Sequence, residues 1–275
     1  MNAIPLILYL SAGILYAVHF TTRNALAGRT GTAVLTLGVV AHAFVTGMQT
    51  QAAGHVPIAG VAQAISVFVG LLALAYLYME MTTGERALGV FITPLLVALQ
   101  LLRVVSPVVE KRVPILESPW FGVHVASLLF AYACLALAFV VGLTYVLLFK
   151  EIKAKHLGYF YARLPSLESL DLMNARTVAL GWVCLTIGVI VGVIWTLQAK
   201  QGPNVDPRVQ AITLADPKIL GAVVSWAIYT FALYARKRGA GGKRAAYISV
   251  VGFAIVLFNF VPIGYFLTRS HNFGG

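Results

Sequence analysis

Charged residues are scarce in this 275-residue chain, and acidic residues are the scarcest of all. Only 11% of the residues are Asp, Glu, Lys or Arg, whereas 60% are hydrophobic. Soluble globular domains carry about 25% charged residues, so this composition excludes an ordinary soluble protein and predicts a membrane protein. The apolar stretches leave no room for a separate soluble domain, so we expect a single transmembrane domain over residues 1–275.

Cysteine is nearly absent, and no recognisable motif contains it. Cys134 and Cys184 both fall in apolar stretches, and the chain has neither a CxxC nor a CxxCH motif. The sequence therefore excludes a thiol oxidoreductase and a c-type cytochrome, and favours thiols that pack as small hydrophobic groups. It also lacks a nucleophile–base pair, a phosphate-binding loop and paired carboxylates, so we predict that the protein is not an enzyme.

Long apolar runs are what the sequence has in abundance. Eight are visible, at about residues 4–20, 32–49, 57–79, 87–107, 120–149, 177–198, 218–235 and 246–268. Only helices and closed barrels satisfy the backbone in lipid, and runs of this length predict an all-α bundle of about eight transmembrane helices. The first run lacks the basic region and cleavage site of a signal peptide, so we expect it to be retained.

Basic residues outnumber acidic ones, 20 to 9. Alternating spans place 13 of the 20 Lys and Arg residues on one side, with a dense group at residues 236–244. The excess of Lys and Arg in cytoplasmic loops predicts that this side is cytoplasmic and that both termini are extracytoplasmic. Because the basic residues lie in short loops that set topology, we predict contact with the lipid bilayer and no nucleic-acid partner.

Two smaller features also carry structural predictions. The connection at residues 151–172 spaces Leu164, Leu167 and Leu170 among basic residues, which predicts either a short helix at the membrane interface or a plain loop. Gly188 and Gly192 form a GxxxG pair that would let a neighbouring helix approach closely.

The six histidines are the best candidates for chemistry. His42 lies inside an apolar run, where a polar ring needs a partner, so it is either a functional residue or a neutral imidazole bonded to a helix carbonyl. His124 and His271 lie far apart in sequence but on the same predicted extracytoplasmic face. Two neutral imidazoles from separate helices can supply both axial ligands of a haem iron. A simple metal site would need a cluster of further ligands, and none is present beside them.

Several stretches, in this order, resemble the cytochrome c assembly proteins of the CcsA, ResC and CcmC type. They are GHVP (54–57), HVASLLFAYA (124–133), LPSLESLDLMNARTVALGW (164–182), LTIGVIVGVIW (185–195), DPKILGAVVSWAIY (216–229), GGKRAAYISVVGFAIVLFNF (241–260) and RSH (269–271). Few tryptophans flank the DPK segment here, and Tyr234 stands where a second intramembrane histidine is expected. The HemX and YpjD branch also lacks most of those tryptophans, so the chain is most similar to that branch.

The resemblance implies an eight-span protein of the bacterial cytoplasmic membrane that handles haem for cytochrome c biogenesis. His124 and His271 would be ligands of the haem iron at the extracytoplasmic face, and His42 would contact haem within the membrane. The cofactor would be haem b, bound stably or in transit, and the partners would be apocytochrome c or other membrane proteins of the assembly pathway. A regulator or scaffold of tetrapyrrole synthesis that acts through protein contacts is the alternative. A small-solute transporter has little support, because no inverted repeat is evident.

Overall fold

The computed structural model describes residues 1–58, 61–106, 117–155, 158–201, 207–210, 213 and 216–258. Within this part of the chain the secondary structure is helical. The helices are α1 (Ala3–Thr22), α2 (Ala25–Ala53), α3 (Val61–Thr83), α4 (Gly89–Val105), α5 (Pro119–Lys153), the 3-10 helix η2 (Tyr161–Arg163), α6 (Leu167–Ala199), α7 (Pro207–Gln210), α8 (Pro217–Lys237) and α9 (Lys243–Phe258). Each of the eight predicted apolar runs coincides, in whole or in part, with one long helix. The prediction of an all-α membrane bundle is therefore confirmed.

Three of the described helices, α2, α6 and α8, begin after a residue whose side chain accepts hydrogen bonds from free backbone N–H groups. Asn24 Oδ1 accepts hydrogen bonds from Leu26 N and Ala27 N at the start of α2. Ser166 Oγ accepts from Ser169 N at the start of α6, and Asp216 Oδ1 accepts from Lys218 N at the start of α8. Such caps satisfy donors that have no partner within the helix.

Two predicted boundaries are wrong for this reason. Helix α2 begins at Ala25, where the apolar run suggested residue 32, and α6 begins at Leu167, where the run suggested residue 177. Leu167 and Leu170 are therefore in the first turn of a membrane helix, and among the described residues of 151–172 the separate helix that forms is the 3-10 helix η2. The Ser166 cap and the complete burial of Leu170 favour a continuous helix. The last predicted run, 246–268, is described only as far as Phe258.

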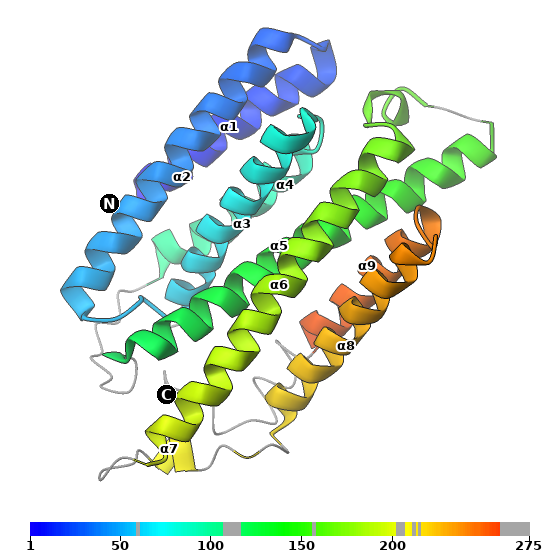
Figure 1. The fold of residues 1–275 in the computed structure, drawn as a ribbon. Coiled ribbons are helices and arrows are strands. Elements are labelled where there is room, and N and C mark those ends of the chain that lie inside the picture. The colour runs from blue at the N-terminus through cyan, green and yellow to red at the C-terminus, as the bar shows by residue number, and fades with distance from the viewer. Residues whose placement is uncertain are drawn as a thin grey trace.

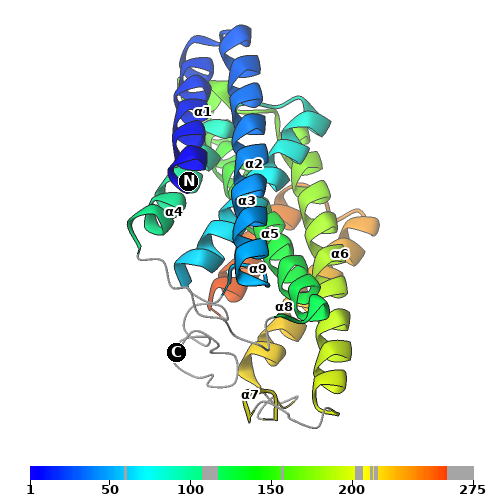
Figure 2. The same cartoon turned by 90° about the vertical axis from the view of Figure 1, so that its left-hand side faces the viewer.

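The long helices pack side by side in two groups (Figure 1). Helices α1 and α2 form an antiparallel pair that packs on α4, while α5 packs on α6 and α9, and α8 packs on α9. Helix α3 joins the groups because it contacts both α4 and α5. The view turned by 90° shows α1 to α4 on one flank of α5 (Figure 2). We call α1–α4 the first half and α5–α9 the second half.

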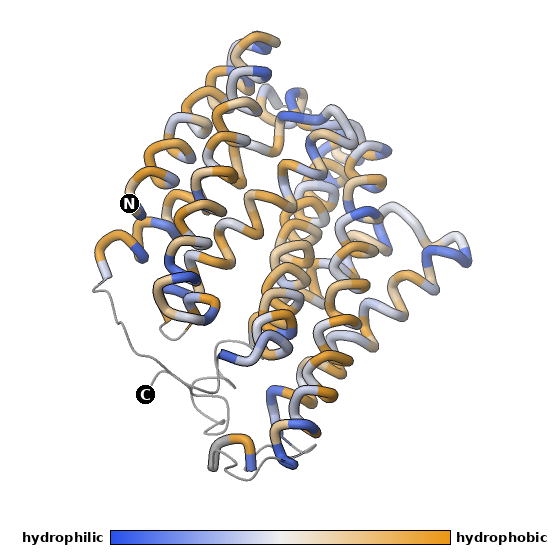
Figure 3. The backbone as a smooth tube through the Cα atoms, turned by 60° about the vertical axis from the view of Figure 1, so that its left-hand side comes forward, coloured by the Kyte–Doolittle hydropathy of each residue, from blue (hydrophilic) through white to orange (hydrophobic). Residues whose placement is uncertain are grey.

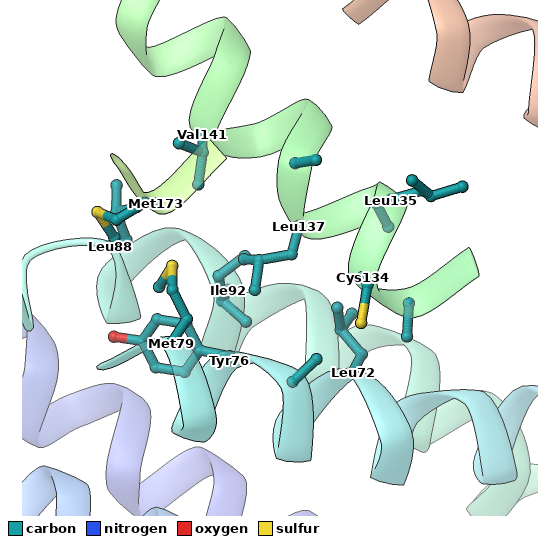
Figure 4. Close-up of a cluster of buried hydrophobic side chains, with 14 of the residues drawn as sticks. Leu72, Tyr76, Met79, Leu88, Ile92, Cys134, Leu135, Leu137, Val141 and Met173 are labelled. Atoms are coloured by element: carbon teal, nitrogen blue, oxygen red, sulfur yellow. The ribbon is translucent and has the colours of Figure 1, made fainter. Parts of the chain in front are cut away.

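The junction between the halves is a buried hydrophobic core (Figure 4). Leu72 and Tyr76 of α3 face Cys134 and Leu137 of α5, and all four side chains are almost completely buried. Met173 of α6 closes the same cluster. Cys134 is a free, buried thiol in this cluster, as expected of a cysteine that packs as a small hydrophobic group.

Hydrophobic residues run along most of each helix (Figure 3), and many of their side chains lie on the outer surface. Ile7, Leu10 and Ile14 of α1 and Ile187 and Ile190 of α6 are exposed over 40% or more of their surface. Six helices are long and apolar enough to cross a membrane, namely α1, α2, α3, α5, α6 and α8, and α4 is a shorter apolar helix. Monomeric soluble proteins rarely expose such large apolar surfaces, so the bundle is that of a multi-pass membrane protein.

The two ends of the bundle differ in their side chains. One end holds the connections that follow α1, α3, α5 and α8, with Arg23, Arg86, Arg163 and Arg238 among their residues, and we call it the basic end. The opposite end holds the N-terminus, the connection from α2 to α3, the start of α5 and the short helix α7 (Figure 1). Since His55 and His124 lie there, we call it the histidine end.

Candidate haem-binding site at the histidine end

His124 lies in the second turn of α5, and its half-buried ring points toward α6. Its Nδ1 is 2.7 Å from the backbone oxygen of Gly188. A carbonyl oxygen only accepts hydrogen bonds, so Nδ1 carries the proton and donates it. In the neutral ring Nε2 then has a free lone pair, and among the described residues the bond to Gly188 is the hydrogen bond that the ring makes.

The two glycines of the GxxxG pair make room for this arrangement. A Cβ on Gly188 would lie 2.7 Å from Leu128 Cδ2 and 3.3 Å from the Leu128 backbone nitrogen. A Cβ on Gly192 would overlap the His124 ring at Cε1 and Nδ1. The predicted close approach of a neighbouring helix is thus confirmed, and the neighbour is α5 carrying His124.

An apolar cluster borders the His124 ring. The Phe121 ring is 6.3 Å from the His124 ring and 4.8 Å from the Trp195 ring, measured between centroids. Phe121, Trp195 and Val209 are buried together, and Ile58 packs against them. Aromatic side chains beside this histidine therefore come from α5 and α6, although the connection between α6 and α8 contains none.

His55 is a second imidazole at the histidine end, and sequence reasoning did not select it. Gly54 ends α2 in the left-handed conformation, with φ of 76°, and turns the chain into the segment at 55–58. The His55 side chain is only 6% exposed. Its Nδ1 is 2.8 Å from the oxygen of Val56, and its buried Nε2 has no hydrogen-bond partner among the residues that the structure describes. The GHVP motif placed this histidine directly after a helix-ending glycine, and that was the available signal.

His42 has a different environment in the interior of the first half. The side chain is 2% exposed and both ring nitrogens are bonded, Nδ1 to Tyr9 Oη at 2.9 Å and Nε2 to Ser66 Oγ at 3.1 Å. Ser66 donates its single proton to Gln100 Oε1 at 3.0 Å, and the Gln100 amide donates to the Asn2 carbonyl at 3.4 Å. His42 Nε2 therefore donates to Ser66, and in the neutral ring Nδ1 accepts from Tyr9. The ring is held by side chains and not by a helix carbonyl.

The remaining histidines are His19, which the structure describes, and His156 and His271, which it does not. His271 lies outside the described residues, as does His156. His19 lies at the basic end, where its Nδ1 bonds the backbone oxygen of Asn24 at 2.8 Å. The predicted pairing of His124 with His271, and the predicted contact of His42 with haem, both stay predictions.

Two aromatic residues singled out by the resemblance have packing roles. Trp226 of α8 donates from Nε1 to Thr186 Oγ1 of α6 at 2.9 Å and stacks on Trp182. Tyr234 is 54% exposed on α8, beneath the guanidinium of Arg238. Neither of these two side chains belongs to the cluster at the histidine end. Trp195, the tryptophan that precedes the DPK segment, does belong to it.

A buried carboxylate near the basic end was missed. Glu80 of α3 is 1% exposed and accepts hydrogen bonds from Tyr16 Oη, at 2.7 Å, and from Thr32 Oγ1. Arg86 Nε lies 3.6 Å from Glu80 Oε1 and also donates to Thr32 Oγ1. The sequence analysis ended the apolar run at residue 79, which left Glu80 in the polar connection that follows. The signal that could have identified a buried carboxylate was its place directly at the end of an apolar run.

Comparison with known proteins places this arrangement in context. Residues 5–273 match the family model described as "Cytochrome C assembly protein". A protein named "Cytochrome c biogenesis protein CcsA" from Guillardia theta is 24% identical over 242 residues, which cover 80% of this chain and 77% of that protein. Proteins of the same name from Heterosigma akashiwo and Microcystis aeruginosa are 26% and 23% identical. Those alignments cover 79% and 90% of this chain, and 76% and 87% of the relatives.

Proposed function

Because the chain belongs to the cytochrome c assembly protein family, we propose that it binds haem at the histidine end and presents it for attachment to apocytochrome c. It is a membrane protein of cytochrome c biogenesis, as its named relatives are. Its own part is to hold and orient haem. We assign it no catalytic residue.

The observation that carries the proposal is the state of the His124 ring. Its Nδ1–H is anchored on the Gly188 carbonyl, which leaves the Nε2 lone pair for a metal. Histidines that ligate metals commonly donate their other ring N–H to a carbonyl or carboxylate, because this bond fixes the tautomer and the ring orientation. The bond to Gly188 therefore prepares His124 as an axial ligand.

The surroundings of His124 suit a porphyrin. Phe121 and Trp195 supply apolar aromatic surface directly beside the imidazole. A haem b held by histidine is consistent with the absence of the CxxCH motif that attaches haem covalently. His271 would supply the second axial ligand, since it belongs to the same face by the predicted topology.

The distribution of basic residues supports an orientation. Arg23, Arg86, Arg163 and Arg238 follow helices that end at the basic end, and Lys and Arg concentrate in cytoplasmic loops. The basic end would then face the cytoplasm, and the histidine end the outer side of a bacterial cytoplasmic membrane, together with both termini. Haem held at His124 would be on the side where apocytochrome c and other membrane proteins of the pathway can meet it.

The test is the visible absorption spectrum of the purified protein with haem, oxidised and reduced. We expect a six-coordinate low-spin spectrum that His124→Ala abolishes. His19→Ala is the matched control, because His19 is also half-buried with Nδ1 bonded to a backbone oxygen, yet lies at the other end. A protein that stays colourless with excess haem, or a His124→Ala variant with an unchanged spectrum, would overturn the proposal.

A regulatory role through protein contacts would use the connection between α5 and α6. Arg163 Nη2 and Tyr159 Oη both donate to the backbone oxygen of Thr21, so this connection is fixed on the end of α1. If the protein proved colourless, loss of partner binding in Arg163→Ala would favour this second function. Retention of binding in His124→Ala would separate it from haem handling.

A further inference from the structure

We propose that His55 is an additional ligand for the haem iron at the histidine end, able to replace His271. The inference rests on the proposed function, because it needs haem at His124. It starts from an anomaly. His55 Nε2 is a buried polar atom with no hydrogen-bond partner among the residues that the structure describes. Leaving such an atom unpaired is unfavourable, and most buried polar atoms are paired.

The protonation of the ring follows from its one bond. The Val56 oxygen can only accept, so His55 Nδ1 carries the hydrogen and, in the neutral ring, Nε2 presents a lone pair. Nε2 can therefore accept a hydrogen bond or bind a metal. His124 has the same arrangement, with Nδ1 anchored on a backbone oxygen and Nε2 unpaired. His42, in contrast, uses both nitrogens within the protein.

The segment that carries His55 lies against the start of α5. A Cβ on Gly122 would be 3.5 Å from Val56 Cγ2, so the backbone of α5 is in contact with this segment. Ile58 packs on the cluster of Phe121 and Trp195, and that cluster borders the His124 ring. The connection after α2, which carries His55, therefore meets the start of α5, which carries His124, beside this cluster (Figure 1).

A reserve ligand has a use in a protein that hands haem over. The iron of a bound haem would supply a Lewis-acid centre for neutral imidazole nitrogens. His55 Nε2 and His271 would both be able to hold it, so that release of one would leave His124 and the other in place. Such an exchange of neutral imidazoles would need neither a proton nor an electron.

The experiment compares haem spectra of variants that lack one or two histidines. His271→Ala should keep a six-coordinate low-spin spectrum, since His55 replaces the missing ligand. His55→Ala with His271→Ala should give a five-coordinate high-spin spectrum, and added imidazole should restore the low-spin form. His19→Ala with His271→Ala is the matched double control and should stay low-spin.

The outcomes separate this inference from the proposed function. A colourless native protein removes both. If the native protein is low-spin but its His271→Ala variant turns high-spin or loses haem, the proposed function stands. The role of His55 is then overturned. A double variant at His55 and His271 that remains low-spin overturns it as well, because another group would then hold the iron. Failure of imidazole to restore the low-spin form in a high-spin double variant would point to a collapsed site and also count against the inference.

Discussion

His42 in the first half of the bundle and His124 in the second are both imidazoles on apolar helices, yet their ring nitrogens differ in use. His42 lies within a chain of hydrogen bonds that runs from Tyr9 through Ser66 to Gln100, and both of its ring nitrogens are occupied. His124 is held through Nδ1 alone, and its Nε2 remains available. The first half repeats its pattern near the basic end, where Glu80 is buried with Tyr16, Thr32 and Arg86 as partners.

This difference separates groups that stabilise the fold from groups that can bind a ligand. A buried polar group whose partners all lie within the protein contributes to stability, and removing one member leaves the others unpaired. A group with one anchored and one unpaired atom is oriented but still reactive. His42 therefore joins α1, α2 and α3 through hydrogen bonds, and the bonding of His124 supports its proposed role as a ligand-binding residue.

The largest effect should come from breaking the chain in the first half. His42→Ala removes a buried ring and leaves Tyr9 and Ser66 without a partner, so the free energy of unfolding should fall by roughly 3–5 kcal/mol. Tyr9→Phe removes one bond and should cost only about 1 kcal/mol. Thermal unfolding in detergent measures both. Any folded His42→Ala protein should keep the haem spectrum, and loss of that spectrum would show instead that His42 contacts haem.

The buried carboxylate should give the next largest effect. Glu80→Gln keeps the shape of the side chain but removes the charge that faces Arg86, so unfolding should become easier by about 2 kcal/mol. Glu85→Gln, a less buried carboxylate in the following connection, is the control and should change stability little. Equal losses in the two variants would contradict a special role for burial at Glu80.

Gly192→Ala should alter the ligand site and spare the rest of the bundle. The added Cβ overlaps the His124 ring and would push it from the Gly188 carbonyl. Loss of such an orienting bond lowers metal affinity about 10- to 100-fold, so haem titration should show at least about tenfold weaker binding. Gly47→Ala is the matched control, because a Cβ there meets no atom within 4 Å. Unchanged haem affinity in Gly192→Ala would mean that the His124 ring needs no fixed position.

The smallest effect is expected at an ion pair near the surface of the second half. Asp171 and Arg236 are 2.6 Å apart, but their side chains are 30% and 23% exposed. Exposed pairs contribute about 0–1 kcal/mol and are screened by salt. Asp171→Asn should therefore lower the free energy of unfolding by less than about 1 kcal/mol, and less still at high salt. A loss of unfolding free energy as large as that of Glu80→Gln would contradict the difference between the buried group of the first half and the exposed pair of the second.

The apolar runs predicted every long helix, because a run of that length in lipid has to close its own hydrogen bonds. Their ends were less certain, since the polar first turns of α2 and α6 do not belong to an apolar run and depend on the caps at Asn24 and Ser166. The sequence also singled out His124 and His42. It could not tell them apart, because both are single polar residues in apolar surroundings, and it passed over His55 and Glu80, which lie where a run meets a connection.

Composition and periodicity thus determined the class of protein, the helices and the histidines worth testing, because the membrane constrains every segment separately. The use of each imidazole nitrogen was decided by the tertiary structure. Tyr9, Ser66 and Gln100 meet His42 only when α1, α3 and α4 pack around α2, and Gly188 meets His124 only when α6 crosses α5. Hydrogen-bond partners that are distant in the chain depend on how the helices pack, and the order of residues within one helix does not contain that information.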